Sequence, residues 1–175
     1  MNWDEYFINM LPSVAAKSKD PDTKVGCIIV SDNNSILTTG YNDFPRKVSH
    51  HPERYKRPLK YDYVSHAEKN AIYNSARNGV SLDGATIYIS FMPCNECVNA
   101  IIGSGISKVI YDYNNCVKTL GRFSIFYCEF MAVTYVHHFD GFVENCPEWI
   151  QKLPIGVQKL EEAEISLIPF GWSKK

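Results

Sequence analysis

The stretch "ATIYISFMPCNECVNAIIGSGISKVIYD", residues 85–112, contains a complete strand–helix–strand pattern. Residues 85–91 alternate like a half-buried strand, and residues 94–103 resemble a helix that ends at glycine. Residues 108–112 form a second short apolar run that is typical of a strand. Because a helical crossover returns the chain to the same sheet, we expect the two strands to be parallel.

Further elements are predicted on the N-terminal side of this unit. They are a helix at about residues 3–17, strands at residues 24–30 and 36–42, and a helix at residues 65–79. Asn2 and Glu5 resemble a capping box for the first helix, and Pro12 predicts a kink or an early interruption. We therefore expect an α/β fold with a largely parallel sheet covered by helices.

Two segments are less regular. Residues 43–63 are polar, interrupted by prolines and rich in Arg, Lys and His, which indicates a long functional loop. Residues 114–147 include "FSIFYCEFMAVTYVHHF", whose composition favours an added hairpin. Residues 147–164 look helical, although Pro154 argues for a break, and residues 165–170 predict a last strand.

Length and composition favour one globular domain over residues 1–175, since 45% of the residues are hydrophobic and 21% are charged. The net charge of −1 gives no reason to expect a nucleic-acid partner. A membrane partner is not expected either, because no apolar run approaches the roughly 20 residues that a spanning helix needs. Six irregularly spaced cysteines and an N-terminus unlike a signal peptide predict reduced thiols in the cytoplasm.

Cys94 and Cys97 form a C-x-x-C pair on the first turn of a predicted helix. Residues three apart share a helix face, so both sulfurs can face one point. The helix N-terminus also favours thiolates, because its unpaired N–H groups carry partial positive charge. The pair alone fits a redox dithiol, half of a structural zinc site or half of a catalytic one.

His66 and Glu68 open the preceding predicted helix and favour the catalytic alternative. Both helices begin at the same sheet edge, so one imidazole and two thiolates can meet and leave one tetrahedral position open. A zinc-bound water at an open position has a pKa of about 7, and a nearby carboxylate can carry its protons. A closed structural site would need a fourth ligand, for which His50, His51 and Cys27 are the candidates. The H-x-E and P-C-x-x-C elements together are the signature of zinc deaminases.

The chain resembles the deoxycytidylate (dCMP) deaminase family of the cytidine deaminase superfamily. The resemblance covers about residues 3–111 and rests on "WDEYF", "SKDPDTKVGCIIV", "GYNDFPR", "KYDYVSHAEKNAI" and "MPCNECVNAIIGSGISKVIY". It implies a three-layer α-β-α fold with a mixed five-stranded sheet and a zinc site at helix N-termini. It also implies zinc-dependent hydrolysis of dCMP at C4 of cytosine, giving ammonia and the dUMP that feeds thymidylate synthesis.

The resemblance implies roles for individual residues. His66, Cys94 and Cys97 would bind one zinc ion per chain. Glu68 would protonate N3 of the base and then the leaving amine. The backbone around Ala67 would contact the pyrimidine carbonyl, and the side chain of Asn42 would bind the sugar.

Other nucleotide contacts are expected from position in the sequence. Arg46 follows the sugar-binding stretch and is the leading candidate for a 5′-phosphate, with Lys24 as a second one. The charges available for further phosphates are Lys47, Arg54 and Lys60. Phe91 and Tyr113 could form walls of the base pocket or belong to the core.

Two departures from the family pattern affect regulation and assembly. Asp43 replaces the glycine of the family's "GYNG", in a segment that borders an allosteric site for dCTP with Mg²⁺ or for dTTP. Residues 114–147 are an atypical insertion, and the apolar text at residues 123–135 could add interface area to a homo-oligomer, commonly a hexamer. Arg77 resembles an arginine used at the family's subunit interface, although an exposed helix-end cation is an equal alternative.

Several alternative functions stay open at this point. The substrate could include dCTP or a 5-substituted dCMP. A tRNA-type polynucleotide deaminase would need a broad cationic groove, which the net charge disfavours. A non-catalytic zinc module would leave Glu68 without a role.

Overall fold

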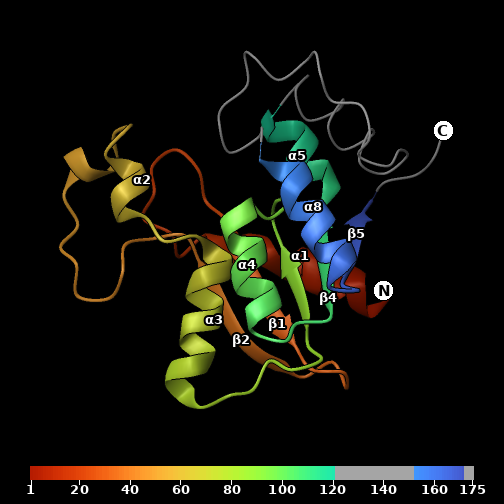
Figure 1. The fold of residues 1–175 in the computed structure, drawn as a ribbon. Coiled ribbons are helices and arrows are strands. Elements are labelled where there is room, and N and C mark those ends of the chain that lie inside the picture. Colours follow the sequence, from red (N-terminus) through yellow and green to blue (C-terminus); the bar gives the residue numbers. More distant parts are fainter. Residues whose placement is uncertain (121–151, 172–175) are drawn as a thin grey trace.

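The computed structural model describes residues 1–120 and 152–171. Its centre is a five-stranded sheet with the order β2-β1-β3-β4-β5 (Figure 1). The strands are β1 (Gly26–Val30), β2 (Ile36–Tyr41), β3 (Thr86–Ile89), β4 (Lys108–Asp112) and β5 (Ser166–Phe170). β1 pairs antiparallel with β2 and β3, whereas β3 with β4 and β4 with β5 are parallel. The expected mixed sheet is therefore confirmed, with β1 opposed to the other described strands.

Helices cover both faces of this sheet (Figure 1). One face carries α1 (Trp3–Ala15), whose Phe7 and Leu11 pack on Ile28 of β1. The other face carries α3, α4 and α8, which share a second core cluster with Ile29 of β1. Their bounds are α3 (Ala67–Asn78), α4 (Asn95–Gly103) and α8 (Leu153–Glu162). This arrangement is the expected three-layer α-β-α architecture.

β1 shows why a continuous apolar run forms the middle of the fold. All five residues of "GCIIV" are buried, because alternate side chains of a strand face opposite layers. Ile28 and Val30 face α1, whereas Cys27 and Ile29 face the layer of α3 and α4. A strand covered on both sides needs apolar residues at every position.

Two glycines allow the helices to approach the sheet closely. A Cβ atom on Gly26 would lie 2.6 Å from the carbonyl oxygen of Leu11 in α1. A Cβ atom on Gly40 would overlap the backbone of Ala67 and Ala71 in α3. Because α3 begins directly after His66, the fit at Gly40 also fixes where the candidate zinc ligand lies.

Side chains of α3 also cover β2, one of the two outer strands of the described sheet. The amide of Asn70 donates to the carbonyl oxygen of Tyr41 (2.8 Å), and that of Asn74 donates to the carbonyl of Thr39 (2.9 Å). These backbone acceptors would otherwise be left unpaired at the sheet edge.

The bounds predicted for the helices and strands up to residue 112, and for the last strand, are confirmed to within two residues. The helix predicted over residues 147–164 is shorter, since α8 begins at Leu153 and ends at Glu162, and residues 147–151 lie outside the described residues. The Asn2 side chain accepts a hydrogen bond from the backbone N–H of Glu5 (2.8 Å), as expected of a helix cap. Pro12 lies inside α1, which ends three residues later. Pro154 lies in the first turn of α8, where its missing N–H leaves no helical bond unmade, so it opens this helix instead of breaking it.

The prediction of a loop over residues 43–63 needs correction. This segment contains a 3₁₀ turn at Pro52–Tyr55 and a short helix, α2 (Lys60–Tyr63). The start of the predicted insertion is helical, since α5 spans Tyr113–Leu120. The proposed hairpin lies outside the described residues. No described helix has the length and apolar character needed to cross a bilayer.

Candidate metal centre and active site

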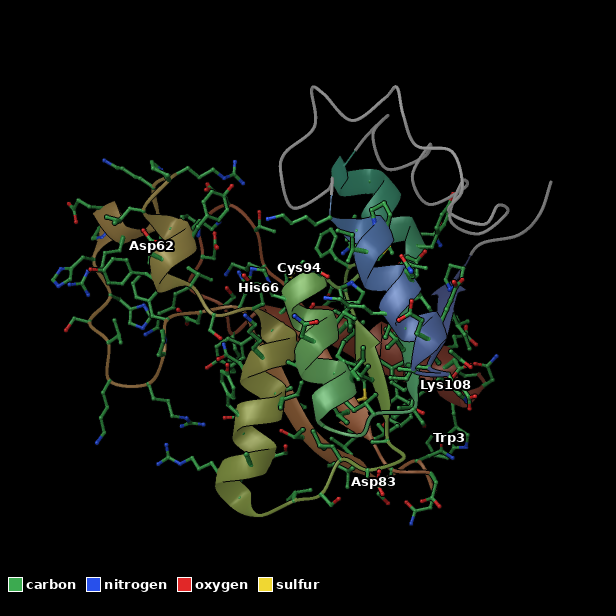
Figure 2. The ribbon with its side chains drawn as sticks, in the orientation of Figure 1. Trp3, Asp62, His66, Asp83, Cys94 and Lys108 are labelled. Atoms are coloured by element: carbon green, nitrogen blue, oxygen red, sulfur yellow. The ribbon has the colours of Figure 1, made fainter. Side chains whose placement is uncertain are left out.

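The helices α3 and α4 begin at the same edge of the sheet, since each follows one of the parallel strands β2 and β3. His66 is the residue that caps α3, and Cys94 caps α4, both with extended backbone. Cys97 follows in the first turn of α4. Figure 2 shows the labelled His66 and Cys94 side by side at the starts of their helices.

The distances among these three side chains fit a zinc ion. His66 Nδ1 lies 3.4 Å from Cys94 Sγ and 3.3 Å from Cys97 Sγ, and the three atoms lie within 4.8 Å of one another. Tetrahedral zinc, with Zn–N near 2.05 Å and Zn–S near 2.3 Å, places its nitrogen and sulfur ligands about 3.6 Å apart. The geometry also identifies Nδ1 as the imidazole atom that faces the sulfurs.

The electrostatics among these three side chains favour a thiolate. The pKa of the Cys94 thiol falls to about 4 because it accepts hydrogen bonds from Cys97 and from His66. The hydrogen bond to Cys94 raises the pKa of His66 to about 9. Thiolate is the form that binds zinc, and metal binding releases the protons that these groups share.

Glu68 is buried in the first turn of α3, with only 5% of its surface exposed. Burial raises the pKa of its carboxyl, and the charge of nearby His66 opposes this rise. Its side chain also contacts Cys97. A carboxyl whose pKa is shifted upward beside a metal site is suited to accept and donate protons.

The candidates for a fourth protein ligand lie elsewhere. His50 Nδ1 contacts the Tyr55 hydroxyl (2.6 Å), and Cys27 is fully buried in β1. His51 is exposed, in the segment that precedes Pro52. Within residues 1–120 and 152–171, the three candidate ligands His66, Cys94 and Cys97 gather without a fourth His, Cys, Asp or Glu.

Asn42 and Asp43 lie at the end of β2 with their side chains in internal contacts. Asn42 is buried, its Oδ1 accepts from the N–H of Val25 (2.7 Å), and its amide donates to the carbonyl of Thr23 (2.8 Å). Asp43 is also buried and accepts a hydrogen bond from the Tyr55 hydroxyl (3.1 Å).

The cations predicted to bind the substrate or to lie at an interface do not gather at one place in the structure. Arg46 is exposed and donates to Asn74 Oδ1 (3.0 Å), eight residues along α3 from His66. At 1.5 Å per helical residue this places it about 12 Å from the start of the helix. Lys24 is exposed near the start of β1, and Arg77 is exposed in the last turn of α3.

The residues expected around the base are buried or partly buried. Ala67 is fully buried at the first position of α3. Phe91 packs against a cluster that includes Tyr111, Tyr113 and Cys116. Tyr113 is 9% exposed and belongs to this cluster, whereas Phe91 is only partly buried.

Lys60 is not available as a phosphate-binding charge, which corrects one expectation. Its ammonium lies 2.7 Å from Asp20 Oδ2, and the residue is 7% exposed. Asp20 has no exposed surface. The sequence analysis missed this pair, because its partners are 40 residues apart in sequence and no spacing rule connects them.

A scan against protein families matches residues 1–113 to the zinc-binding region of cytidine and deoxycytidylate deaminases. The chain belongs to this deaminase family. It is 39% identical over 117 residues to the human deoxycytidylate deaminase, a match that covers 63% of this chain and 65% of the human protein. It is 37% identical over 123 residues to the deoxycytidylate deaminase of Mycobacterium phage D29, covering 63% of this chain and 94% of the phage protein.

The deaminase fold extends beyond the matched segment. A solved dCMP deaminase of cyanophage S-TIM5, in complex with dCMP and dUMP, superimposes with a TM-score of 0.62. The match covers 95% of each chain at 20% identity, which establishes the common fold. The chain spans less than two thirds of the length of the first animal relatives, the human protein included.

Proposed function

We propose that this chain is a zinc-dependent hydrolase that converts dCMP and water to dUMP and ammonia. The observation that carries the proposal is the cluster of one imidazole nitrogen and two thiols at the starts of α3 and α4, with a buried carboxyl beside it. A redox dithiol would not need His66 or Glu68 at this place. The deoxycytidylate deaminases among the relatives support the choice of substrate.

His66 Nδ1, Cys94 Sγ and Cys97 Sγ would hold the zinc ion. When bound, the zinc lowers the pKa of a water molecule to about 7 and so supplies a nucleophile for C4 of cytosine. Glu68 would take one proton from the water and deliver it to N3 of the base, and would then take the second proton from the new C4 hydroxyl and deliver it to the departing amine. The C4–N bond breaks, a C4–O bond replaces it, and ammonia leaves. Carrying these protons requires a carboxyl that is neither permanently ionised nor permanently protonated, and the burial of Glu68 supports this role.

The nucleotide contacts are proposals of the same kind. The backbone of Ala67 would contact the pyrimidine carbonyl, and Phe91 with Tyr113 would border the base. Asn42 would bind the sugar through the second lone pair of its Oδ1. Arg46 would exchange Asn74 for the 5′-phosphate, with Lys24 as the alternative cation.

The same proposal includes an oligomeric state, an allosteric site and a cellular compartment. A homo-oligomer, with the hexamer as the leading candidate, would place Arg77 at a subunit interface. An allosteric site for dCTP with Mg²⁺, or for dTTP, would border Asp43, whose buried carboxylate replaces the glycine of the family pattern "GYNG". Zinc binding needs reduced Cys94 and Cys97, so a reducing compartment such as the cytoplasm is proposed.

The deciding experiment measures ammonia release from dCMP, dCTP, deoxycytidine and a cytosine-containing oligonucleotide. We expect dCMP to be preferred. Equal turnover of deoxycytidine would contradict the nucleotide assignment, and preference for the oligonucleotide would favour a polynucleotide deaminase. A zinc-loaded protein that releases no ammonia from any of them would indicate a non-catalytic module.

The phosphate assignment is tested with Arg46→Ala. A charge-assisted hydrogen bond contributes roughly 1.5–3 kcal/mol, so kcat/KM for dCMP should fall about ten- to a hundred-fold. The loss should be much smaller with deoxycytidine, which has no phosphate. Lys108→Ala is the control, since Lys108 is an exposed cation at the start of β4 to which no role in binding or assembly is assigned. Equal losses on both substrates would contradict the assignment.

A further inference from the structure

The chain between β2 and α3 leaves the body of the fold as a separate lobe, residues 43–65, beside the start of α3 (Figures 1 and 2). The two ends of the lobe meet in an antiparallel bridge. The N–H of Asp43 donates to the Ser65 carbonyl (3.2 Å), and the N–H of Ser65 donates to the Asp43 carbonyl (2.9 Å). The closed end of the lobe therefore directly precedes the candidate zinc ligand His66.

The lobe has a small aromatic core of its own. The ring of Phe44 stacks on those of Tyr55 and His50, with centroid distances of 4.5 and 4.9 Å. Tyr63 packs against the same Phe44 ring at 5.7 Å. Phe44 and Tyr55 are both buried. Because these contacts join its start, middle and end, we expect the lobe to move as one unit.

One ion pair ties this unit to the body of the fold. Lys60 Nζ lies 2.9 Å from Asp20 Oδ1 and 2.7 Å from Oδ2, and Asp20 lies in the segment before β1. Asp20 is fully buried and Lys60 is 7% exposed. Separating the pair would leave the buried Asp20 carboxylate without a countercharge, which is strongly unfavourable.

The same carboxylate orients the residue at the root of the lobe. Asp20 Oδ2 also accepts from Asn42 Nδ2 (3.2 Å), and the backbone carbonyl of Asn42 accepts from the Ser18 hydroxyl (2.6 Å). The backbone N–H groups of Asp22 and Thr23 donate to Asp20 Oδ1 (2.9 and 3.1 Å). Asp20 therefore joins the lobe, the end of β2 and the segment before β1 in one buried network.

We propose that Lys60 is a positioning residue: its ion pair with Asp20 holds the lobe and the Asn42 amide in place beside the zinc centre, and so sets the affinity for the nucleotide. This inference rests on the proposed function for its kinetic part. The metal ligands lie on α3 and α4 and need no contact with Lys60. Loss of the pair should therefore affect substrate binding more than zinc binding or the chemical step.

The experiment uses zinc-loaded protein with Lys60→Met, the double variant Asp20→Asn/Lys60→Met, and Lys56→Met as the control. Lys56 is an exposed lysine in the same lobe. For Lys60→Met we expect KM for dCMP to rise about ten-fold or more while kcat stays within about three-fold, the pattern of lost uniform binding. Zinc content should be unchanged, and Lys56→Met should behave like the wild type.

The second readout does not depend on activity. Trypsin can cut the lobe after Arg46, Lys47, Arg54 and Lys56, and mass spectrometry maps the cut sites. We expect Lys60→Met to be cut in the lobe about ten times faster than the wild type, because cleavage follows the population of the opened segment. The core should stay protected.

The double variant separates positioning from stability. It removes both charges, so its thermal unfolding midpoint should return from that of Lys60→Met toward that of the wild type. KM for dCMP and the rate of trypsin cleavage in the lobe should stay raised, because the ion pair between Lys60 and Asp20 is still missing. Recovery of KM together with the midpoint, or unchanged lobe cleavage in Lys60→Met, would overturn the proposal. If Lys60→Met does not fold, the double variant decides by the same two measurements. A wild type inactive on dCMP would refute the proposed function, whereas the trypsin comparison would still test the positioning role.

Discussion

Glu68 lies close to the candidate metal ligands but is not one of them. Its carboxyl is buried in the first turn of α3 beside Cys97, and it is absent from the three-atom cluster that fits zinc. Glu96, in the first turn of α4, is exposed and pairs with Lys69 Nζ at 2.7 Å. Glu68 and Glu96 thus lie in the first turns of two neighbouring helices, but only Glu68 is buried and only Glu96 forms an ion pair with Lys69.

For Glu68→Gln we expect the zinc content to stay at one ion per chain and turnover of dCMP to fall at least about 10²-fold, because an amide cannot carry the protons. Steady-state kinetics and metal analysis on the same sample test this. Glu96→Gln is the matched control and should keep activity within a few-fold. Activity of Glu68→Gln near that of the wild type would mean that another group moves the protons.

For the double variant Cys94→Ser/Cys97→Ser we expect loss of tightly bound zinc. A hydroxyl is a far weaker zinc ligand than a thiolate, and only His66 would remain of the cluster. Metal analysis after dialysis against a chelator measures the effect. Cys116→Ser, at a buried thiol outside the cluster, is the control and should keep its zinc. Full zinc retention in the double variant would contradict the assigned ligand set.

Asp20 predicts a pH dependence of stability. Burial would raise the pKa of its carboxyl, but hydrogen bonds from Lys60 and from the N–H groups of Asp22 and Thr23 bring it below the usual value. The folded-state pKa is therefore lower than the unfolded-state value of about 3.9, so the stabilisation is complete above that pH and is lost as the pH falls through the folded-state pKa.

We expect the free energy of unfolding of the wild type to fall below about pH 4, and this acid-dependent part to be smaller in Asp20→Asn/Lys60→Met. Removing only one partner, as in Asp20→Asn, should cost up to about 3–5 kcal/mol at neutral pH, because Lys60 stays buried and keeps only the longer contact with Asp22 Oδ2 (3.9 Å). Urea unfolding at several pH values measures both effects. An unchanged acid dependence in the double variant would show that Asp20 does not contribute to it.

The elements of the fold follow from local patterns where those patterns are long. α3 has a cap at each end of the pattern, with Gly79 in the left-handed conformation (φ 67°), and was predicted to within two residues. α2 was missed because it has four residues, a single turn whose sequence carries no period. Its position depends on Lys60 reaching Asp20, a contact between distant parts of the chain. The candidate zinc ligands were predictable because they belong to short sequence motifs, H-x-E and P-C-x-x-C, whereas the network around Asp20 joins residues far apart in the chain.

The contact between β2 and α3 gives a prediction at this scale. Gly40→Ala should destabilise the fold by about 1–3 kcal/mol, because the added methyl group overlaps the backbone of Ala67 and Ala71. The displacement of α3 should also weaken zinc binding through His66. Urea unfolding and chelator competition measure these two effects. Gly103→Ala is the control, since a Cβ atom there meets nothing within 4 Å.

At the scale of the whole molecule, we expect a homo-oligomer in solution. Light scattering at micromolar concentration tests this, and the hexamer is the leading candidate. A variant in which a short polar linker replaces the apolar segment of residues 123–135 tests whether this segment adds interface area. If it does, the variant should associate more weakly than the wild type. A stable monomer in the wild type would contradict both expectations.

The two asparagines of α3 that cover β2 limit how copies of the chain can associate. Asn70 and Asn74 already donate to the outward carbonyls of Tyr41 and Thr39, so a strand from another molecule would have to displace them before extending the sheet there. Joining β2 of one molecule head-to-tail to β5 of the next would build an open fibre, whereas a two-fold pairing of β2 with β2 would close at a dimer. The side that carries α3 thus acts as a terminator of strand addition, and it favours assemblies of finite size over fibril growth.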